Sequence, residues 1–394
     1  MKVGKIMYAA GPGDVVNTFR HWEVGIDDPS QFSVTYSGQF YDTCKKLNLN
    51  GVVISSNPRK DKICTDRFVI KNSPLLFRSK DVRGMLYTLL HIYNGLVIVF
   101  NALRYRVDTL IVADGTSYWF VFSILKLFKI KFIPTMHCVL WPPFKNINKK
   151  QKMLLKLSSY TLQKHTKSIL VVSEDIRNQV IELTEKKDNI YISSLPKYRK
   201  TAFQNIKSAN WNSQNFVVLF VGRIEINKGV TDLLDIAKKF QDIKNNRIKF
   251  HICGEGSALT LIENKINEMS LQQSVKLLGH CTKEKLAEQY NLANCVIVPT
   301  RTSFIEGLNK VVIEGVLAAR PIVTSKVCPA MNLVTEAVVE VQADSVDSYY
   351  QAILKLLTDE VFYKSKIKGC IHNQDKLLQN NVSWSENLSK VLKI

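Results

Sequence analysis

Short apolar runs alternate with amphipathic patterns throughout the second half of the chain. Runs of strand length predict strands, and segments whose apolar residues recur every three or four positions predict helices. The predicted strands are 216–222, 247–253, 275–278, 295–299, 321–325 and 337–341, and the predicted helices are 230–240, 258–269, 283–292 and 308–319. Because these strands are continuously apolar, the pattern favours a parallel sheet covered by helices on both faces.

The first half repeats this alternation less regularly. Its predicted strands are 3–9, 51–54, 109–113, 132–135, 169–172 and 190–193, with the clearest helical patterns at 87–104 and 116–128. The polar segment 197–213 separates the halves. We therefore predict an α/β protein with two Rossmann-like domains, 1–200 and 201–375, and a C-terminal helix in 376–394 that packs back on the first domain.

Composition narrows the class of protein. The chain has 394 residues, of which 46% are hydrophobic and 22% charged, which excludes disordered, collagen-like and coiled-coil classes. Apolar runs such as 118–125 are shorter than the ~20 residues that span a bilayer, so we expect no membrane span and no secretory leader. The eight cysteines lack the spacing of metal sites, which indicates reduced thiols in a cytoplasmic protein without a metal site.

The formal net charge of +20 is concentrated in the first half. Residues 1–200 hold 31 Lys and Arg against 15 Asp and Glu, and the remainder holds 23 against 19. Residues 115–173 contain ten lysines and no acid, with aromatic residues such as Trp119 and Phe144 between them. This composition suits an anionic membrane surface, although the lysines could instead serve only solubility.

The loop GRIEINKG, residues 222–229, follows the first predicted strand of the second half. Gly222 permits a sharp turn, and Arg223 and Lys228 lie beside the start of the next helix. Two cations next to free helix N–H groups suit a diphosphate. A surface turn with two solvated cations is the alternative.

The segment EGLNKVVIE places Glu306 before a predicted helix and Glu314 about 12 Å further along it. The amides of Gly307, Leu308 and Asn309 would face an anion at the helix start. A carboxylate can accept hydrogen bonds from two vicinal hydroxyl groups, so Glu306 could hold a sugar and Glu314 a ribose. The alternative is one Glu favoured by the helix dipole and one solvated Glu.

Other strand-end loops give weaker signals. Gly254 and Gly256 would allow close approach of a ligand, and His280 could face a nucleobase. In the first half, Gly13 follows the first strand and could bring its N–H group near a phosphate. Asp114 and His137 end two further strands; a histidine there is a candidate catalytic group, and the aspartate could bind an acceptor hydroxyl.

Three segments resemble, in order and spacing over residues 216–330, those of the retaining glycosyltransferases of family 4 (glycosyl transferases group 1). They are GRIEINKG, CGEGS and EGLNKVVIEGVLAARPIVTS. The resemblance implies a GT-B fold, with two parallel sheets facing across a cleft and a UDP or GDP sugar as donor. It implies that Arg223 and Lys228 hold the diphosphate without a metal or other cofactor. Glu306 would contact the transferred sugar and Glu314 the ribose, with His137 in the active site.

Two positions depart from the family pattern. Asn309 stands where Pro is frequent, and the segment 326–329 replaces a frequent glycine pair near the donor sugar. The second departure bears on which sugar is bound.

The resemblance, together with the basic first half, implies a metal-independent retaining hexosyltransferase of bacterial surface polysaccharide biosynthesis. Its acceptor is expected to be a saccharide linked to polyprenyl diphosphate, and its location the cytoplasm at the inner face of the plasma membrane. The alternatives are a sugar-nucleotide epimerase of the same fold and a non-catalytic protein that binds polyanions or nucleic acid. The sequence contains no nucleic-acid recognition motif, so no nucleic-acid partner is expected.

Overall fold

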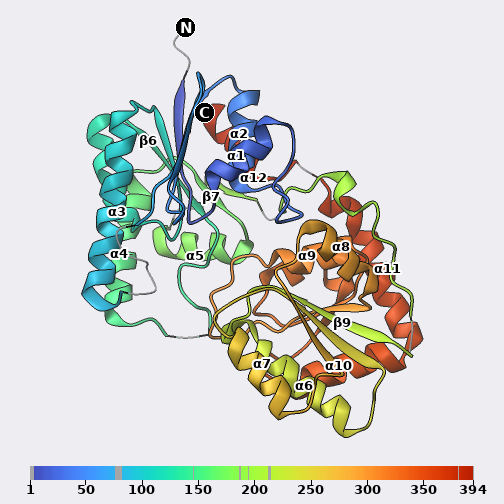
Figure 1. The fold of residues 1–394 in the computed structure, drawn as a ribbon. Coiled ribbons are helices and arrows are strands. Elements are labelled where there is room, and N and C mark those ends of the chain that lie inside the picture. The colour runs from blue at the N-terminus through green and yellow to red at the C-terminus, as the bar shows by residue number, and fades with distance from the viewer. Residues whose placement is uncertain are drawn as a thin grey trace.

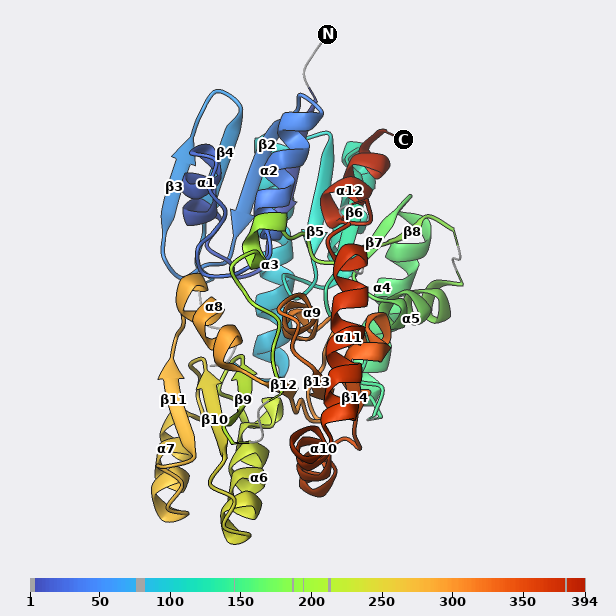
Figure 2. The ribbon, with the colours of Figure 1, turned by 90° about the vertical axis from the view of Figure 1, so that its right-hand side faces the viewer.

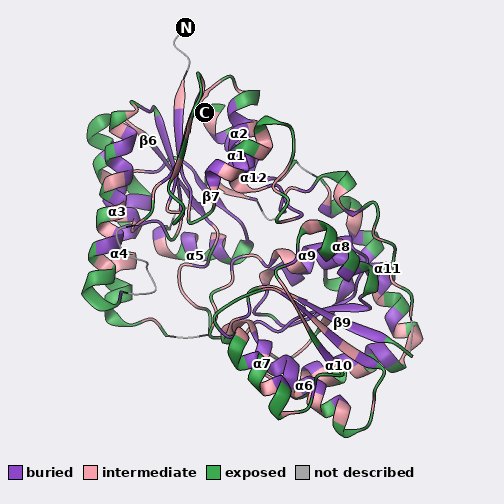
Figure 3. Ribbon diagram, viewed as in Figure 1, coloured by how far each residue is buried: buried purple, intermediate pink, exposed green. Residues whose placement is uncertain are grey.

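Each half of the chain folds around one β-sheet, and the two sheets with their helices form two layered α/β domains (Figure 1). The computed structural model describes residues 4–75, 82–144, 146–185, 188–193, 195–211, 214–379 and 381–393. Most strand residues are buried, and the exposed residues lie mainly on the outer sides of the helices and in the loops (Figure 3).

The N-terminal sheet has the strand order β3-β4-β2-β1-β5-β6-β7-β8. Its strands are β1 (Lys5–Ala9), β2 (Asn50–Ser55), β3 (Asp61–Cys64), β4 (Phe68–Asn72), β5 (Thr109–Ala113), β6 (Lys131–Met136), β7 (Ile169–Val171) and β8 (Ile190–Ile192). All pairs are parallel except β3 with β4, an antiparallel pair at the edge. The sequence analysis missed β3 and β4, because burial alternates along both strands and neither forms a uniformly apolar run.

Helices cover both faces of this sheet. One face packs against α3 (Gly84–Arg104), the 3₁₀ helix η2 (Trp119–Phe128), α4 (Lys149–Lys164) and α5 (Glu174–Thr184). The other face packs against α1 (Val15–Glu23), α2 (Tyr36–Lys46) and α12 (Trp384–Lys393). Helices α1, α2, α4 and α5 each begin after a capping side chain that accepts a hydrogen bond from a free N–H group of the first turn. The capping residues are, in that order, Asp14, Thr35, Asn148 and Ser173.

Helix α3 corrects one expectation. It is 21 residues long with a mean hydropathy of 1.5, so by length and composition alone it could cross a membrane. The expectation that no segment reaches this length was wrong because uncharged polar residues such as Asn94 divide the apolar stretch without making it hydrophilic. In the fold, α3 packs against the sheet through Ile98, Val99 and Ala102.

The C-terminal sheet is parallel, with the order β11-β10-β9-β12-β13-β14. Its strands are β9 (Phe216–Val221), β10 (Ile248–Cys253), β11 (Val275–Gly279), β12 (Cys295–Val298), β13 (Ile322–Thr324) and β14 (Val338–Glu340). Its α-helices are α6 (Val230–Asp242), α7 (Leu259–Glu268), α8 (Lys283–Leu292), α9 (Lys310–Leu317), α10 (Val346–Thr358) and α11 (Glu360–Leu377). The 3₁₀ helices are η3 (Lys200–Phe203), η4 (Ile226–Lys228), η5 (Pro329–Leu333) and η6 (Thr335–Ala337).

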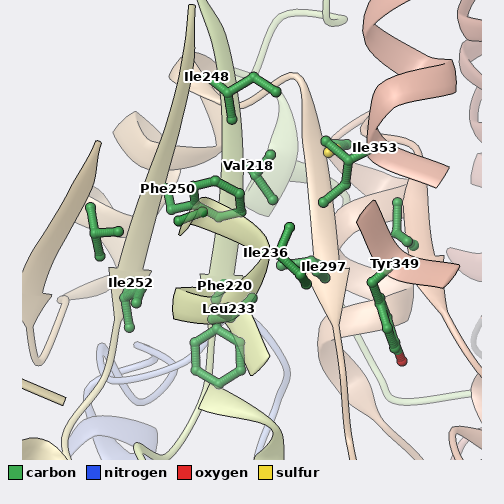
Figure 4. Close-up of a cluster of buried hydrophobic side chains, with 14 of the residues drawn as sticks. Val218, Phe220, Leu233, Ile236, Ile248, Phe250, Ile252, Ile297, Tyr349 and Ile353 are labelled. Carbon is green, nitrogen blue, oxygen red and sulfur yellow. The ribbon is translucent and has the colours of Figure 1, made fainter. Parts of the chain in front are cut away.

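The predicted strands and helices of this half match the structure within two residues at each end. Figure 4 shows one of its two cores, in which Val218 and Phe220 of β9 pack against Leu233 of α6 and against Ile297 and Ile353. The strands are apolar on both faces because a second core lies on the other side of the sheet.

Several contacts connect the domains, and three of them involve α12, Phe32 and the loop before α9. Helix α12 returns to the N-terminal domain, where Trp384 is buried and its indole N–H donates to the Thr135 hydroxyl at 2.8 Å (Figure 2). In the opposite direction, Phe32 is buried in the C-terminal core, with its ring centroid 4.8 Å from that of Phe203 and 5.9 Å from that of Tyr290. The loop before α9 makes the third contact.

Candidate functional site

Two cations converge at the carboxyl end of β9. Lys228 ends η4, and its Nζ lies 3.7 Å from the ring centroid of Phe304. The guanidinium of Arg223 lies 5.7 Å from the same ring and donates to the Glu225 carboxylate at 2.8 Å. Arg223 is exposed, whereas Lys228 is largely buried. The structure therefore brings together the two cations that the sequence predicts for a diphosphate.

Glu306 lies directly beside this pair. Its Oε2 accepts from Lys228 Nζ at 2.7 Å and from Asn309 Nδ2 at 3.3 Å. The Glu306 side chain is only 12% exposed and that of Lys228 14%, so the ion pair is shielded from water. Sequence reasoning missed Phe304, although an aromatic residue two positions before Glu306 in the same strand-end loop was a visible signal.

Helix α9 begins at Lys310, two residues later than predicted. The Asn309 side chain accepts the N–H group of Val311 at 3.1 Å and so caps the helix. Gly307 and Leu308 consequently precede the helix. The expectation that their amides form its first turn was wrong, because Asn is a strong capping residue and starts the helix after itself.

Gly307 and Leu308 instead contact the N-terminal domain. A Cβ atom on Gly307 would overlap the carbonyl oxygen of His137 and lie 3.0 Å from Cα of Cys138. The Leu308 side chain packs against apolar clusters of both domains. The close approach of two backbones explains why glycine is needed at position 307.

His137 lies at the end of β6 between its own domain and this loop. Its Nε2 is 3.2 Å from Thr135 Oγ1, and the Thr135 hydroxyl already accepts the indole N–H of Trp384. The Thr135 hydroxyl hydrogen is free to donate to Nε2, and in the tautomer that accepts this hydrogen bond the proton of the neutral ring is on Nδ1. Nδ1 is buried and has no partner among the described residues. Burial lowers the pKa of His137 to about 3, so the ring is neutral at physiological pH.

Asp114 supports the same loop. One of its carboxylate oxygens, Oδ2, accepts the N–H groups of His137 at 2.9 Å and Cys138 at 2.7 Å. Burial raises the pKa of Asp114 to about 7. The carboxyl group thus fixes the backbone on which His137 stands, a role that the sequence analysis did not assign to it.

Glu314 faces the protein interior, so the alternative of a solvated glutamate was wrong. It is buried, and its Oε1 accepts from the Tyr198 hydroxyl at 3.3 Å. Burial raises the pKa of Glu314 to about 7, although the ammonium group of Lys310 acts in the opposite direction. Lys310 itself donates to Ser33 Oγ at 3.0 Å and to Gln31 Oε1 at 3.3 Å, across the domain boundary.

A cavity of about 610 Å³ lies between the first strand-end loop and α9. Gly13 lines it, and a Cβ atom there would meet nothing within 4 Å. Asp114, His137 and Lys310 also line it, whereas Arg223, Lys228 and Glu306 are not part of its wall. The site therefore has two parts, this cavity and the adjacent cluster of Arg223, Lys228 and Glu306. The two parts meet where Gly307 contacts His137.

The remaining predicted glycines serve packing between loops. A Cβ atom on Gly254 would overlap the carbonyl oxygen of Gly222, and one on Gly256 would overlap that of Ile224. Close approach is indeed required at both glycines, but the groups that approach belong to the neighbouring loop rather than to a ligand. His280 is exposed after β11, and no hydrogen bond or ring contact within the described ranges joins it to the cation cluster.

The segment that departs from the family pattern lies close to this cluster. Asn309 Nδ2 is 3.9 Å from the sulfur of Cys328, and Cys328 is buried. Lys326 is exposed and pairs with Glu340 at 3.5 Å. The backbone of 326–329 therefore turns near Glu306 without the glycine pair.

Comparisons with known proteins agree with this geometry. Residues 202–373 match the family model described as glycosyl transferases group 1. A glycosyltransferase of Methanocaldococcus jannaschii, described as uncharacterized, is 24% identical over 57% of this chain and 58% of its own length. A 2-deoxystreptamine N-acetyl-D-glucosaminyltransferase of Niallia circulans is 23% identical over 58% of this chain and 61% of its own length. The capsular polysaccharide biosynthesis glycosyltransferase CapM of Staphylococcus aureus is 26% identical over 55% of this chain and 59% of its own length. The chain thus spans about three fifths of the length of these curated relatives.

Solved structures match the whole chain. Sucrose-phosphate synthase from Thermosynechococcus elongatus has a TM-score of 0.73 at 14% identity and covers 99% of this chain and 98% of its own. Anabaena HepE, solved with UDP and glucose, has a TM-score of 0.68 at 12% identity and covers 99% of both chains. The C-terminal domain therefore belongs to the glycosyl transferases group 1 family, and the whole chain has the GT-B fold of its structural neighbours.

Proposed function

We propose that the protein is a retaining hexosyltransferase that moves a sugar from a nucleoside-diphosphate sugar to a saccharide acceptor. The observation that carries the proposal is the shielded contact of Lys228 with Glu306, 2.7 Å long, next to Asn309 at the start of α9. A cation and a carboxylate side by side can bind the two ends of the bond that breaks. Lys228 attracts the phosphate that leaves, and Glu306 accepts hydroxyl groups of the sugar.

In the proposed reaction, the bond between the anomeric carbon and the β-phosphate oxygen breaks, and its electrons stay on the phosphate. Arg223 and Lys228 stabilise the negative charge that develops there, so no metal ion is needed for this step. The acceptor hydroxyl attacks from the same face, and its proton passes to the leaving phosphate oxygen. The anomeric configuration is thereby retained.

Other groups would position the reactants. Glu314 is proposed to bind the ribose, with its carboxyl oriented by the Tyr198 hydroxyl. Nδ1–H of His137 is a buried donor without a partner among the described residues, and it lies in the wall of the cavity, which suits a sugar hydroxyl. The Gly13 backbone, open to the same cavity, would face the phosphates.

Relatives guide the choice of substrates. HepE was solved with UDP and glucose, which supports UDP ahead of GDP as the donor nucleotide. CapM is named for capsular polysaccharide biosynthesis, which supports a role in bacterial surface polysaccharide assembly. We further propose a polyprenyl-diphosphate-linked saccharide as acceptor and a cytoplasmic site of action at the inner membrane face.

A thermal-shift panel of UDP, GDP, ADP and their sugars tests the donor assignment, because a ligand that binds only the folded state raises the melting temperature. We expect UDP compounds to stabilise the protein and the Lys228→Ala variant to lose that response. The same result in excess EDTA would support metal independence. If no nucleotide raised the melting temperature, the proposed function would be wrong.

Product analysis separates transfer from epimerisation. Incubation with a labelled donor should release UDP only when a saccharide acceptor is present, and NMR of the product should show the donor's anomeric configuration. Conversion of the donor sugar without an acceptor would favour an epimerase, and an inverted product would exclude retention.

A further inference from the structure

The outward face of α3 is apolar along its whole length. Six exposed apolar side chains fall within an arc of about 100° when successive residues are placed 100° apart, and Tyr87, which is 37% exposed, lies outside this arc. Met85 at the start is 76% exposed and Phe100 near the end is 60% exposed. The full stripe is Met85, Leu86, Leu89, Tyr93, Leu96 and Phe100.

The opposite face holds α3 flat against the domain. Ile98 and Val99 are buried in the core beneath the helix. A Cβ atom on Gly95 would overlap the Ser117 hydroxyl and lie 2.8 Å from the Val121 side chain, so glycine allows α3 to pack closely on η2. The helix therefore lies along the protein surface and does not project from it.

Helices η2 and α4 continue the exposed apolar surface. Leu127 of η2 is 78% exposed and Tyr160 of α4 is 59% exposed. A groove of about 440 Å³ between these helices is lined by Met153 and Leu157. Lys150 at the start of α4 donates to the Thr88 hydroxyl of α3 at 2.7 Å, which joins the surfaces. We refer to the exposed residues of α3, η2 and α4 as the α3–α4 face. It forms the outer edge of the N-terminal domain, away from the C-terminal domain (Figure 1).

Positive charge surrounds this face. Residues 82–173 contain thirteen lysines and arginines and only two acids, Asp108 and Asp114. Asp108 accepts the backbone N–H of Lys5, and Asp114 is used inside the site. Arg83 and Arg104 flank the two ends of α3, and the described lysines of η2 and α4 are exposed. Lys145 lies outside the described residues. Long cationic side chains around apolar residues suit the boundary between lipid tails and anionic headgroups.

A small pocket with several polar groups lies between the α3–α4 face and the site. Tyr93 belongs to the apolar stripe and also lines a pocket of about 110 Å³ together with Asn94, Ser55 and Ser73. Ala10 lines both this pocket and the 610 Å³ cavity that contains His137. Hydroxyl and amide groups beside an apolar helix suit a saccharide attached to a lipid.

We propose that the α3–α4 face docks on an anionic lipid bilayer, with α3 lying in the plane of the headgroups. A lipid-linked acceptor then keeps its chain in the bilayer and passes its saccharide by Tyr93 and Asn94 toward the cavity. This proposal rests on the proposed function and adds to it the protein surface that contacts the bilayer in which the lipid-linked acceptor is held. The charge around the face favours a bilayer over a second copy of this chain, because two copies would bring the same cations together.

Co-sedimentation with vesicles tests this proposal independently of activity. The full-length protein should bind vesicles that contain phosphatidylglycerol, bind pure phosphatidylcholine at least tenfold more weakly, and release in high salt. The double variant Leu89→Glu with Phe100→Glu should lose at least tenfold in affinity. A matched double variant on α11, Val361→Glu with Ile371→Glu, changes two exposed apolar residues of the other domain and should bind as the wild type does.

The lysines are tested separately. A triple variant with Gln at three lysines of α4 should bind anionic vesicles about fivefold more weakly per lysine removed. The three positions are Lys149, Lys152 and Lys156. Changing the exposed Lys60, Lys244 and Lys276 to Gln removes the same charge elsewhere and should have little effect.

Circular dichroism and the melting temperature establish that each variant is folded. The proposal is overturned if the wild type does not bind anionic vesicles, or if both double variants bind equally. It is also overturned if the α3 variant only dissociates a dimer in size-exclusion chromatography, because the face would then join two copies. Nucleotide-induced thermal shifts of the same variants report on the donor site. A failure of lipid binding with an intact UDP response would therefore leave the proposed function in place.

Discussion

The ammonium group of Lys228 lies 2.7 Å from the carboxylate of Glu306, and both side chains are largely shielded from water. We expect Lys228→Ala to lower kcat about 100-fold or more, since removal of one positioned group that stabilises developing charge has this order of effect. Steady-state kinetics with the donor found in the thermal-shift panel would measure it. Lys238→Ala, which removes an exposed ion pair with Asp242 and a hydrogen bond to Gln241 outside the site, is the matched control and should retain activity. Equal rates for the two variants would remove Lys228 from the mechanism.

Asp114 supports the loop of His137, so its loss should affect stability and activity together. Asp114→Ala leaves the N–H groups of His137 and Cys138 without their acceptor. A fully buried N–H group would cost about 1–3 kcal/mol, and the loss should be smaller here because His137 is only partly buried and Cys138 is exposed. Urea unfolding should show this loss, whereas Asp114→Asn keeps an acceptor oxygen and should recover much of it. If the alanine variant were as stable as the asparagine variant, the two backbone contacts would be unimportant.

Glu314 should make stability depend on pH in a defined window. Burial raises its pKa from 4.5 to about 7, so the folded protein keeps a proton that the unfolded chain releases above pH 4.5. Its contribution therefore destabilises the fold progressively as the pH rises from 4.5 to 7, by at most about 1.4 kcal/mol per pH unit.

The Glu314→Gln variant does not titrate at this position. Its free energy of unfolding, minus that of the wild type, should rise across the same window and level off above pH 7. Urea unfolding at several pH values would measure the difference. Parallel pH curves for the two proteins would contradict the assignment.

Gly307 tests the contact between the domains. Gly307→Ala places a methyl group against the carbonyl oxygen of His137, so the two halves of the site should separate slightly. We expect kcat/KM to fall at least tenfold, because small displacements of positioned groups have large effects on rate. Gly4→Ala, whose new Cβ would lie 3.1 Å from the flexible end of Leu49 and 3.9 Å from Asp108 Oδ2, is the control. Normal kinetics in the Gly307 variant would show that the contact tolerates extra volume.

The sequence predicted the six strands and the first four helices of the C-terminal domain, but not α10 and α11, and it predicted less of the N-terminal domain. Strands β9 and β12 are apolar on both faces and end in recognisable loops, so pattern alone located them. Strand β3 packs on one side only and forms no apolar run, so the pattern missed it. Helix α3 was predicted from its pattern, but that pattern did not show that its exposed side is also apolar.

Within the site, residue types were predictable but their partners were not. The positions of Lys228 and Glu306 followed from loop spacing, whereas their direct contact depends on how β9 and β12 lie side by side. The glycines at 254 and 256 were recognisable as sites of close approach. Only the three-dimensional arrangement shows that the approaching atoms belong to the loop at 222–224.

The burial of Phe32 restricts how the two domains can move. This ring comes from the N-terminal half yet is buried among Leu195, Phe203 and Tyr290. Pulling it into water would cost roughly 2–3 kcal/mol. A hinge motion that admits the donor and releases the product is therefore expected to pivot about Phe32, with the largest displacement at the end of the interface furthest from this ring.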